Sequence, residues 1–128
     1  MSIIAKLEEL RSNAGKVRTQ GLPDATIERM AAQFPELAEA IDDALVTQRA
    51  LAKEFPGLIA LDEAAQLARV QGDFVNFYAG DAVNPYVALA ARGPWVVTLK
   101  GAVLHDSGGY GMLGFGHTPK AILAALTK

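Results

Sequence analysis

The chain has 128 residues, 51% of them hydrophobic, and a formal net charge of −2 at pH 7, which fits a soluble globular domain and excludes a disordered chain. Lysines and arginines do not cluster, so we expect no nucleic-acid partner. The absence of cysteine excludes disulfides and thiolate metal sites.

The N-terminus lacks the pattern of a signal peptide. Its first apolar residues run within a few positions into Glu8, Glu9 and Arg11, so they form no long apolar core. No stretch approaches the roughly 20 apolar residues that span a bilayer. We therefore expect a cytoplasmic protein without a membrane partner.

The first two thirds of the chain are predicted to be helical. Ile3 to Arg11 is a short amphipathic segment. A second helix is expected to begin near Pro23-Asp24, because proline suits a first turn and aspartate can accept its unpaired N–H groups. Pro35 is expected to open a third helix with an apolar stripe. That stripe consists of Leu37, Ile41, Ala44, Leu45, Leu51 and Phe55.

Two further boundaries follow from proline and aspartate. Pro56-Gly57 is predicted to stop the third helix. Asp62 is predicted to be the N-cap of a fourth helix over 63–71.

A β-hairpin is predicted after the pattern changes near Asn84-Pro85. Trp95 to Leu99 and Ala102 to Asp106 are rich in strand formers, and Lys100-Gly101 lies between them where a two-residue turn fits. A glycine-rich loop follows, and Pro119 is expected to open a final helix. The apolar side of that helix consists of Ile122, Leu123 and Leu126.

The predicted fold class is α+β and predominantly helical. Several N-terminal helices precede one β-hairpin, a glycine-rich loop and a C-terminal helix. We divide the chain into a helical region over 1–83 and a hairpin, loop and helix segment over 84–128. A lone two-stranded hairpin is marginal in water. This one must therefore pack on the helices, join a partner chain or belong to a larger sheet.

The glycine-rich loop contains a G-x-G-x-x-G pattern, formed by Gly109, Gly111 and Gly114. In a dinucleotide site the third glycine already lies in a helix that follows a strand of a βαβ unit. Here Pro119 starts the helix too late, and the preceding strand belongs to a hairpin. The pattern is therefore interpreted as a loop that turns the chain, and a nucleotide site is disfavoured.

The longer string is more specific. It runs from Gly93-Pro94-Trp95 through Lys100-Gly101 and His105-Asp106 to the glycine-rich loop and Gly116-His117-Thr118-Pro119, followed by a helix. This order resembles the N-terminal segment of class III, fold-type I, pyridoxal 5'-phosphate (PLP)-dependent aminotransferases.

The resemblance implies a role on the substrate side of an active site. In the family, the loop before the Gly-His pair contributes to the pocket. The implied substrate-binding residues are Tyr110, Gly111, Gly116 and His117. The implied full-length enzyme is a homodimer that transfers an amino group between an amino acid and a 2-oxo acid with PLP.

The cofactor lysine is expected to lie outside this chain. A PLP transaminase needs a Schiff-base lysine, an acidic partner for the pyridine nitrogen and phosphate donors. In the family these lie downstream of the Gly-His pair. Lys100, Lys120 and Lys128 are each interpreted as solvated surface lysines. We therefore expect no catalytic residue, no bound cofactor and no activity in this chain alone.

The two histidines, His105 and His117, match no metal-ligand spacing, so no metal site is predicted. His117 is expected to make a local capping or loop hydrogen bond. Ser107 lies near His105 and Asp106, but neighbours along a strand point to opposite faces, which does not favour a triad.

Two alternatives to the aminotransferase segment stay open. The first is a self-contained, mainly helical interaction module without enzymatic activity. The second is a small binding domain that holds an anion in the glycine-rich loop.

Overall fold

The computed structural model describes residues 1–72, 79, 82, 85–107 and 114–127. This part of the chain is α+β and dominated by helices, with one small antiparallel sheet. Its elements, in chain order, are α1 (Ile3–Arg11), α2 (Asp24–Gln33), α3 (Pro35–Glu54), α4 (Pro56–Ile59), α5 (Glu63–Gln71), β1 (Ala88–Arg92), β2 (Trp95–Thr98), β3 (Val103–His105) and α6 (Lys120–Leu126).

The predicted helix boundaries are confirmed where local signals set them. Helix α3 begins at Pro35 and α5 follows Asp62. Helix α3 ends at Glu54, as expected, but Pro56 then opens the short helix α4. The break lies at Phe55, whose backbone (φ −130°, ψ 60°) is not helical. The Pro-Gly pair therefore redirects the chain into a further helical turn.

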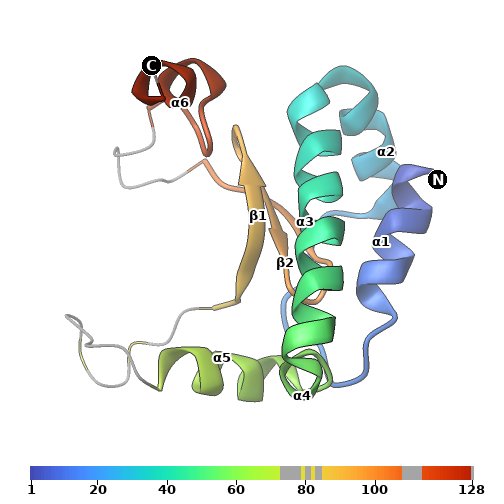
Figure 1. The fold of residues 1–128 in the computed structure, drawn as a ribbon. Helices are drawn as coiled ribbons and strands as arrows, with labels where there is room; N and C mark the ends of the chain where they lie inside the picture. The colour runs from blue at the N-terminus through green and yellow to red at the C-terminus, as the bar shows by residue number, and fades with distance from the viewer. Residues whose placement is uncertain (73–78, 80–81, 83–84, 108–113, 128) are drawn as a thin grey trace.

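Helix α3 lies at the centre of the fold, between the sheet on one side and α1 and α2 on the other (Figure 1). Its apolar stripe is buried along Leu37, Ile41, Ala44 and Leu45, whereas Phe55 is largely exposed. The core joins residues from before and after position 84. Its members are Leu7, Leu10, Ile27, Leu37, Ala40, Ile41, Ala44, Leu45, Trp95, Val97 and Val103.

The sheet has the order β1-β2-β3, with both strand pairs antiparallel. The predicted hairpin is confirmed as β2 and β3, which pair Trp95 with His105 and Val97 with Val103. Strand β1 was not predicted, because its sequence of alanines with one leucine carries little β-propensity. It pairs with β2 and packs on α3, so the hairpin does not stand alone.

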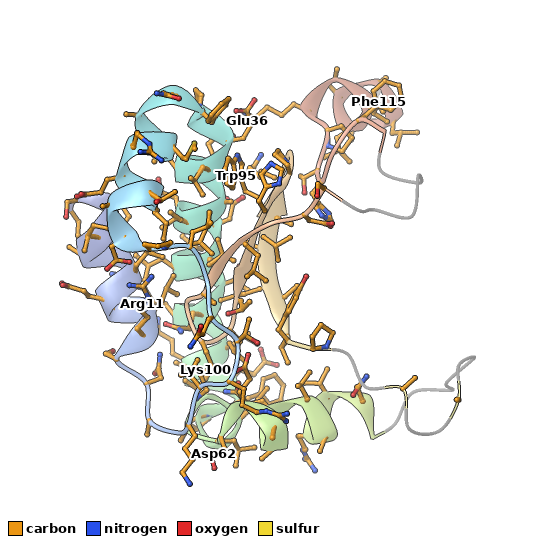
Figure 2. All side chains as sticks on the ribbon, turned by 180° about the vertical axis from the view of Figure 1, so that it is seen from behind. Arg11, Glu36, Asp62, Trp95, Lys100 and Phe115 are labelled. Carbon is orange, nitrogen blue, oxygen red and sulfur yellow. The ribbon has the colours of Figure 1, made fainter. Side chains whose placement is uncertain are left out.

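Helix α6 lies beside the end of β1, and none of its residues is buried (Figure 1). Its predicted apolar side is solvent-exposed, with Ile122 at 39%, Leu123 at 45% and Leu126 at 78%. The preceding Phe115 is 80% exposed and points outward (Figure 2). The helix therefore presents an apolar surface that the described residues do not cover.

Across the described part of the chain, no helix combines the length and apolar character needed to cross a bilayer.

Replacement of Ile41 by alanine tests the central position of α3. Ile41 is fully buried in the core, so the cavity should lower the free energy of unfolding by about 2–5 kcal/mol. The control is Val46→Ala on the same helix, where the side chain is 68% exposed and the change should stay within about 0.5 kcal/mol. Urea denaturation measures both, and equal effects would contradict this core.

Candidate functional site

Two of the four residues implied by the resemblance, Gly116 and His117, lie where the glycine-rich segment meets α6. Tyr110 and Gly111 lie outside the described residues. The site therefore has to be built from Gly116 and His117 and from the groups around them.

A backbone bridge attaches this junction to the turn between β1 and β2. The N–H of Gly93 donates to the carbonyl of His117 (3.0 Å), and the N–H of His117 donates to the carbonyl of Gly93 (2.8 Å). Gly116 has a φ of +73°, and a Cβ there would lie 2.8 Å from the Cα of Gly93. Both conformation and space therefore require glycine at position 116.

A side-chain pair reinforces the bridge. Nε2 of His117 lies 2.9 Å from Oδ2 of Asp106, and the two side chains are 24% and 27% exposed. The N–H of Asp106 also donates to the carbonyl of Pro94 (2.7 Å). The hydrogen bond expected of His117 is thus present, with Asp106 as its partner. Both ends of the glycine-rich segment attach to the same turn at Gly93-Pro94.

Thr118 carries backbone strain at the same place. Its φ is +49°, a left-handed conformation that is rare for a β-branched residue. Its hydroxyl donates to the carbonyl of Ala91 on β1 (2.8 Å). Such strain persists only where the surroundings hold it, and it concentrates at functional sites.

The second histidine is not part of this junction. His105 is exposed, and its ring meets Trp95 edge-on with centroids 5.0 Å apart. Among the described residues, no three His, Asp or Glu side chains are arranged to hold a metal ion.

The expectation that Lys100 is a solvated surface residue was wrong. Lys100 is 3% exposed, and its Nζ donates to the carbonyls of Ala14 (2.5 Å) and Ile59 (3.2 Å). The hairpin turn points into the region where the α1–α2 connection meets the end of α4, which covers the lysine. Figure 2 shows Lys100 on this side of the molecule, close to Asp62.

Burial lowers the pKa of Lys100, although Asp62 and Glu63 act in the opposite direction. Lys120 is a surface residue, as expected, and pairs with Glu39 on α3 (2.6 Å). Lys128 lies outside the described residues.

Lys100 and Lys120 do not fit the Schiff-base position of a PLP site. The amino group of Lys100 is enclosed and hydrogen-bonded to two carbonyls, so it is not presented to a cofactor aldehyde. Lys120 lies on the surface of α6, with its side chain 68% exposed. Among the described residues, the contacts of both amino groups are with other parts of the chain and not with the Gly116-His117 junction.

The start of α5 fastens the α1–α2 connection. Oε2 of Glu63 accepts from the backbone N–H groups of Arg18 (2.6 Å) and Thr19 (2.8 Å). Oδ1 of Asp62 accepts from the N–H of Lys16 (2.7 Å). Asp62 occupies the predicted N-cap position, but its side chain makes no capping bond within α5 and binds this connection instead.

These contacts set the ionisation of Glu63. Burial raises the pKa of its carboxyl, but the N–H groups of Thr19 and Arg18, together with the charge of Lys100, outweigh burial and lower the pKa below 4.5. The charged cluster of Asp62, Glu63 and Lys100 is structural, because each of its three side chains hydrogen-bonds to backbone groups.

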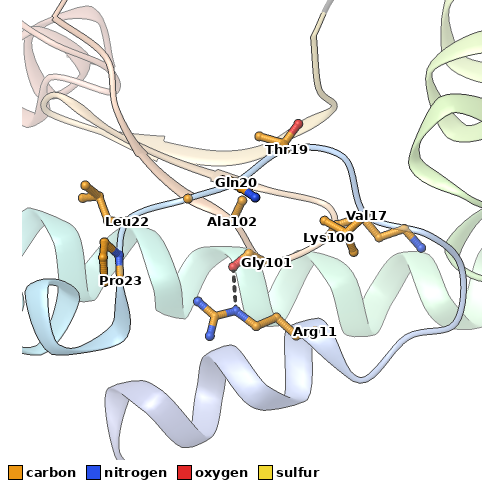
Figure 3. A pocket seen from close by; sticks show the side chains of 10 residues that line it. Arg11, Val17, Thr19, Gln20, Leu22, Pro23, Lys100, Gly101 and Ala102 are labelled. Carbon is orange, nitrogen blue, oxygen red and sulfur yellow. Dashed lines mark hydrogen bonds between the residues drawn. The ribbon is translucent and has the colours of Figure 1, made fainter.

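A groove of about 420 Å³ lies beside the hairpin turn (Figure 3). Its two cations are already engaged. Nε of Arg11 donates to the carbonyl of Gly101 (3.1 Å) and its Nη1 to Asp24 (2.8 Å), while Lys100 turns its amino group to Ala14 and Ile59. The groove therefore offers a weak environment for an anion.

Sequence reasoning missed the pairing partners of these residues. Asp106 was not expected to hydrogen-bond to His117, and Glu63 was considered only as the first residue of a helix. A lysine at the tip of an apolar hairpin was a signal for burial, since the residues on both sides of it, from Trp95 to Val103, are buried.

Comparisons with protein-family models, with curated proteins and with solved structures found no match to this chain.

Replacement of Gly116 by alanine tests the junction. The added Cβ meets the Gly93 backbone, and φ +73° strains any L-residue, so we expect a loss of more than about 1 kcal/mol in unfolding free energy. Gly114→Ala is the matched control, because a Cβ at Gly114 has open space around it. Thermal and urea unfolding of both variants gives the comparison, and an equally stable G116A would refute this packing.

Replacement of Glu63 by glutamine tests the charged cluster of Asp62, Glu63 and Lys100 through the pH dependence of stability. The folded-state pKa of Glu63 is lowered, so its ionisation stabilises the fold above pH 4.5, and this contribution is lost as the pH falls through and below that value. E63Q should be less stable than the parent chain near pH 7, and the difference should shrink in acid.

The control for this pH series is Glu28→Gln, an exposed residue on α2. It should track the parent chain across the series in urea denaturation at each pH. A gap between E63Q and the parent chain that does not change with pH would contradict the assignment.

Proposed function

We propose that this chain is the N-terminal segment of a class III, PLP-dependent aminotransferase that acts in the cytoplasm as a homodimer. The segment supplies a substrate-side loop and dimer contacts, and the full-length enzyme exchanges an amino group between an amino acid and a 2-oxo acid. Tyr110, Gly111, Gly116 and His117 are the proposed substrate-side residues.

The observation that carries this proposal is the order of the hairpin, the Gly116-His117 junction and the helix that follows Pro119. The sequence resemblance places these elements in this order, and the structure has β2, β3, the junction and α6 in it. The glycine at position 116 is required by its close approach to Gly93, so the Gly-His pair has a physical function here.

The exposed α6 gives independent support. An apolar helix face with Leu126 78% exposed is costly to leave in water, so it fits a segment that packs on further protein. The same face would serve an interaction module, and the experiment below separates the two functions.

The cofactor is proposed to bind outside this segment. When bound, PLP supplies the electron sink for amino-group transfer. Since neither Lys100 nor Lys120 fits the Schiff-base position, the residues of this chain would shape and orient the substrate pocket.

The test is the size and cofactor content of the native protein. We expect a polypeptide well above 13.5 kDa that contains tryptic peptides of this chain. After borohydride reduction, mass spectrometry should locate the phosphopyridoxyl group on a lysine outside these 128 residues. The recombinant 128-residue chain, treated identically, is the control and should stay unlabelled at Lys100.

Two outcomes would overturn parts of this proposal. A native polypeptide of 13.5 kDa without PLP would favour the interaction module. A phosphopyridoxyl group on Lys100 or Lys120 would instead place the cofactor in this segment.

A further inference from the structure

We propose that His117 is a proton-accepting group, held by Asp106 in the tautomer that protonates Nε2 and presents Nδ1 to a ligand. The ligand class is a small molecule with a hydroxyl or a protonated amine. This inference goes beyond the aminotransferase assignment and stands on the geometry of the pair alone.

The tautomer follows from the partner. A carboxylate only accepts hydrogen bonds, so at 2.9 Å from Oδ2 of Asp106 the Nε2 atom of His117 must donate. A neutral imidazole has a single N–H, so Nδ1 is left unprotonated. Asp106 thus determines which ring nitrogen can take up a proton.

The second ring nitrogen, Nδ1, has no hydrogen-bond partner among the described residues. Among the described residues, the ring of His117 hydrogen-bonds only to Asp106, and only through Nε2. The side chain is 24% exposed, so solvent reaches it.

The pair is held rigidly. The backbone of His117 is bridged to Gly93 in both directions, and the N–H of Asp106 donates to Pro94 of the same turn. Thr118, strained at φ +49°, fixes the following residue to β1. Because the neighbouring backbone is fixed by these hydrogen bonds, the pair needs little rearrangement when a ligand binds.

The proposed step is a proton transfer. The O–H or N–H bond of the ligand breaks, its electron pair stays on the ligand atom, and the proton forms a new bond to Nδ1. The resulting imidazolium is stabilised by the Asp106 carboxylate, as in carboxylate–histidine pairs of hydrolases. His117 is the proton acceptor, and Asp106 is a positioning residue.

The test is nitrogen-15 NMR of the two histidine side chains in alkaline buffer. We expect His117 to carry its proton almost entirely on Nε2, whereas exposed His105 reports the behaviour of a ring without a carboxylate partner. Asp106→Asn should shift the tautomer of His117 and leave His105 unchanged, because an amide can donate to Nε2. Asp106→Glu should retain the Nε2–H form.

Diethyl pyrocarbonate gives a chemical readout, because it acylates an unprotonated imidazole nitrogen. D106N should slow acylation of His117 several-fold and leave the rate at His105 unchanged, with both sites measured by peptide mass spectrometry. A change in stability alone would not separate the two histidines in this way.

The tautomer of His117 in the parent chain tests the proposal even if D106N does not fold. A parent spectrum with the His117 proton on Nδ1 would overturn the proposal. So would a folded D106N with an unchanged tautomer. These measurements involve no cofactor, so a negative result for the His117 tautomer does not contradict the aminotransferase proposal. In the same way, a native polypeptide of 13.5 kDa would not contradict the His117 proposal.

Discussion

The fold depends on one helix that is buried on two sides. Helix α3 packs against β1 and β2 on one side and against α1 and α2 on the other, with Ile41 among the buried core residues. Buried Gln48 joins these layers, because its Nε2 donates both to the carbonyl of Leu10 at the end of α1 and to that of Leu99 in the hairpin. A three-stranded sheet of this size gains its stability from such packing.

The sheet anchored in this way has two unlike ends. At the hairpin turn, Lys100 is enclosed by the backbone carbonyls of Ala14 and Ile59 and lies near the charges of Asp62 and Glu63. These contacts hold the hairpin turn against the α1–α2 connection and the end of α4. At the opposite end, the Gly93-Pro94 turn receives the Gly116-His117 junction, where polar groups stay partly exposed. The enclosed end is structural, whereas the His117 and Asp106 side chains at the other end are partly exposed to solvent.

This division explains why the two histidines and the lysines separate into different roles. A lysine whose donors are satisfied by carbonyls contributes to folding, and its burial lowers its pKa without presenting it to a ligand. The imidazole of His117 is hydrogen-bonded through Nε2 and partly exposed, which is the arrangement on which the proposed proton transfer rests. Helix α6, whose apolar side chains are exposed, begins at Lys120, shortly after His117 in the chain.

The sequence by itself determined the local structure. Helices α2, α3 and α5 begin where Pro23-Asp24, Pro35 and Asp62 predict, and two runs of strand formers around Lys100-Gly101 form the predicted hairpin, because these signals act over a few residues. Only the tertiary structure decided the burial of Lys100, whose carbonyl partner Ala14 is 86 positions away, the pairing of Asp106 with His117 and the recruitment of alanine-rich β1. Those outcomes depend on which distant surfaces meet when α3 buries its two sides, so the contact partners of these residues cannot be read from any local pattern.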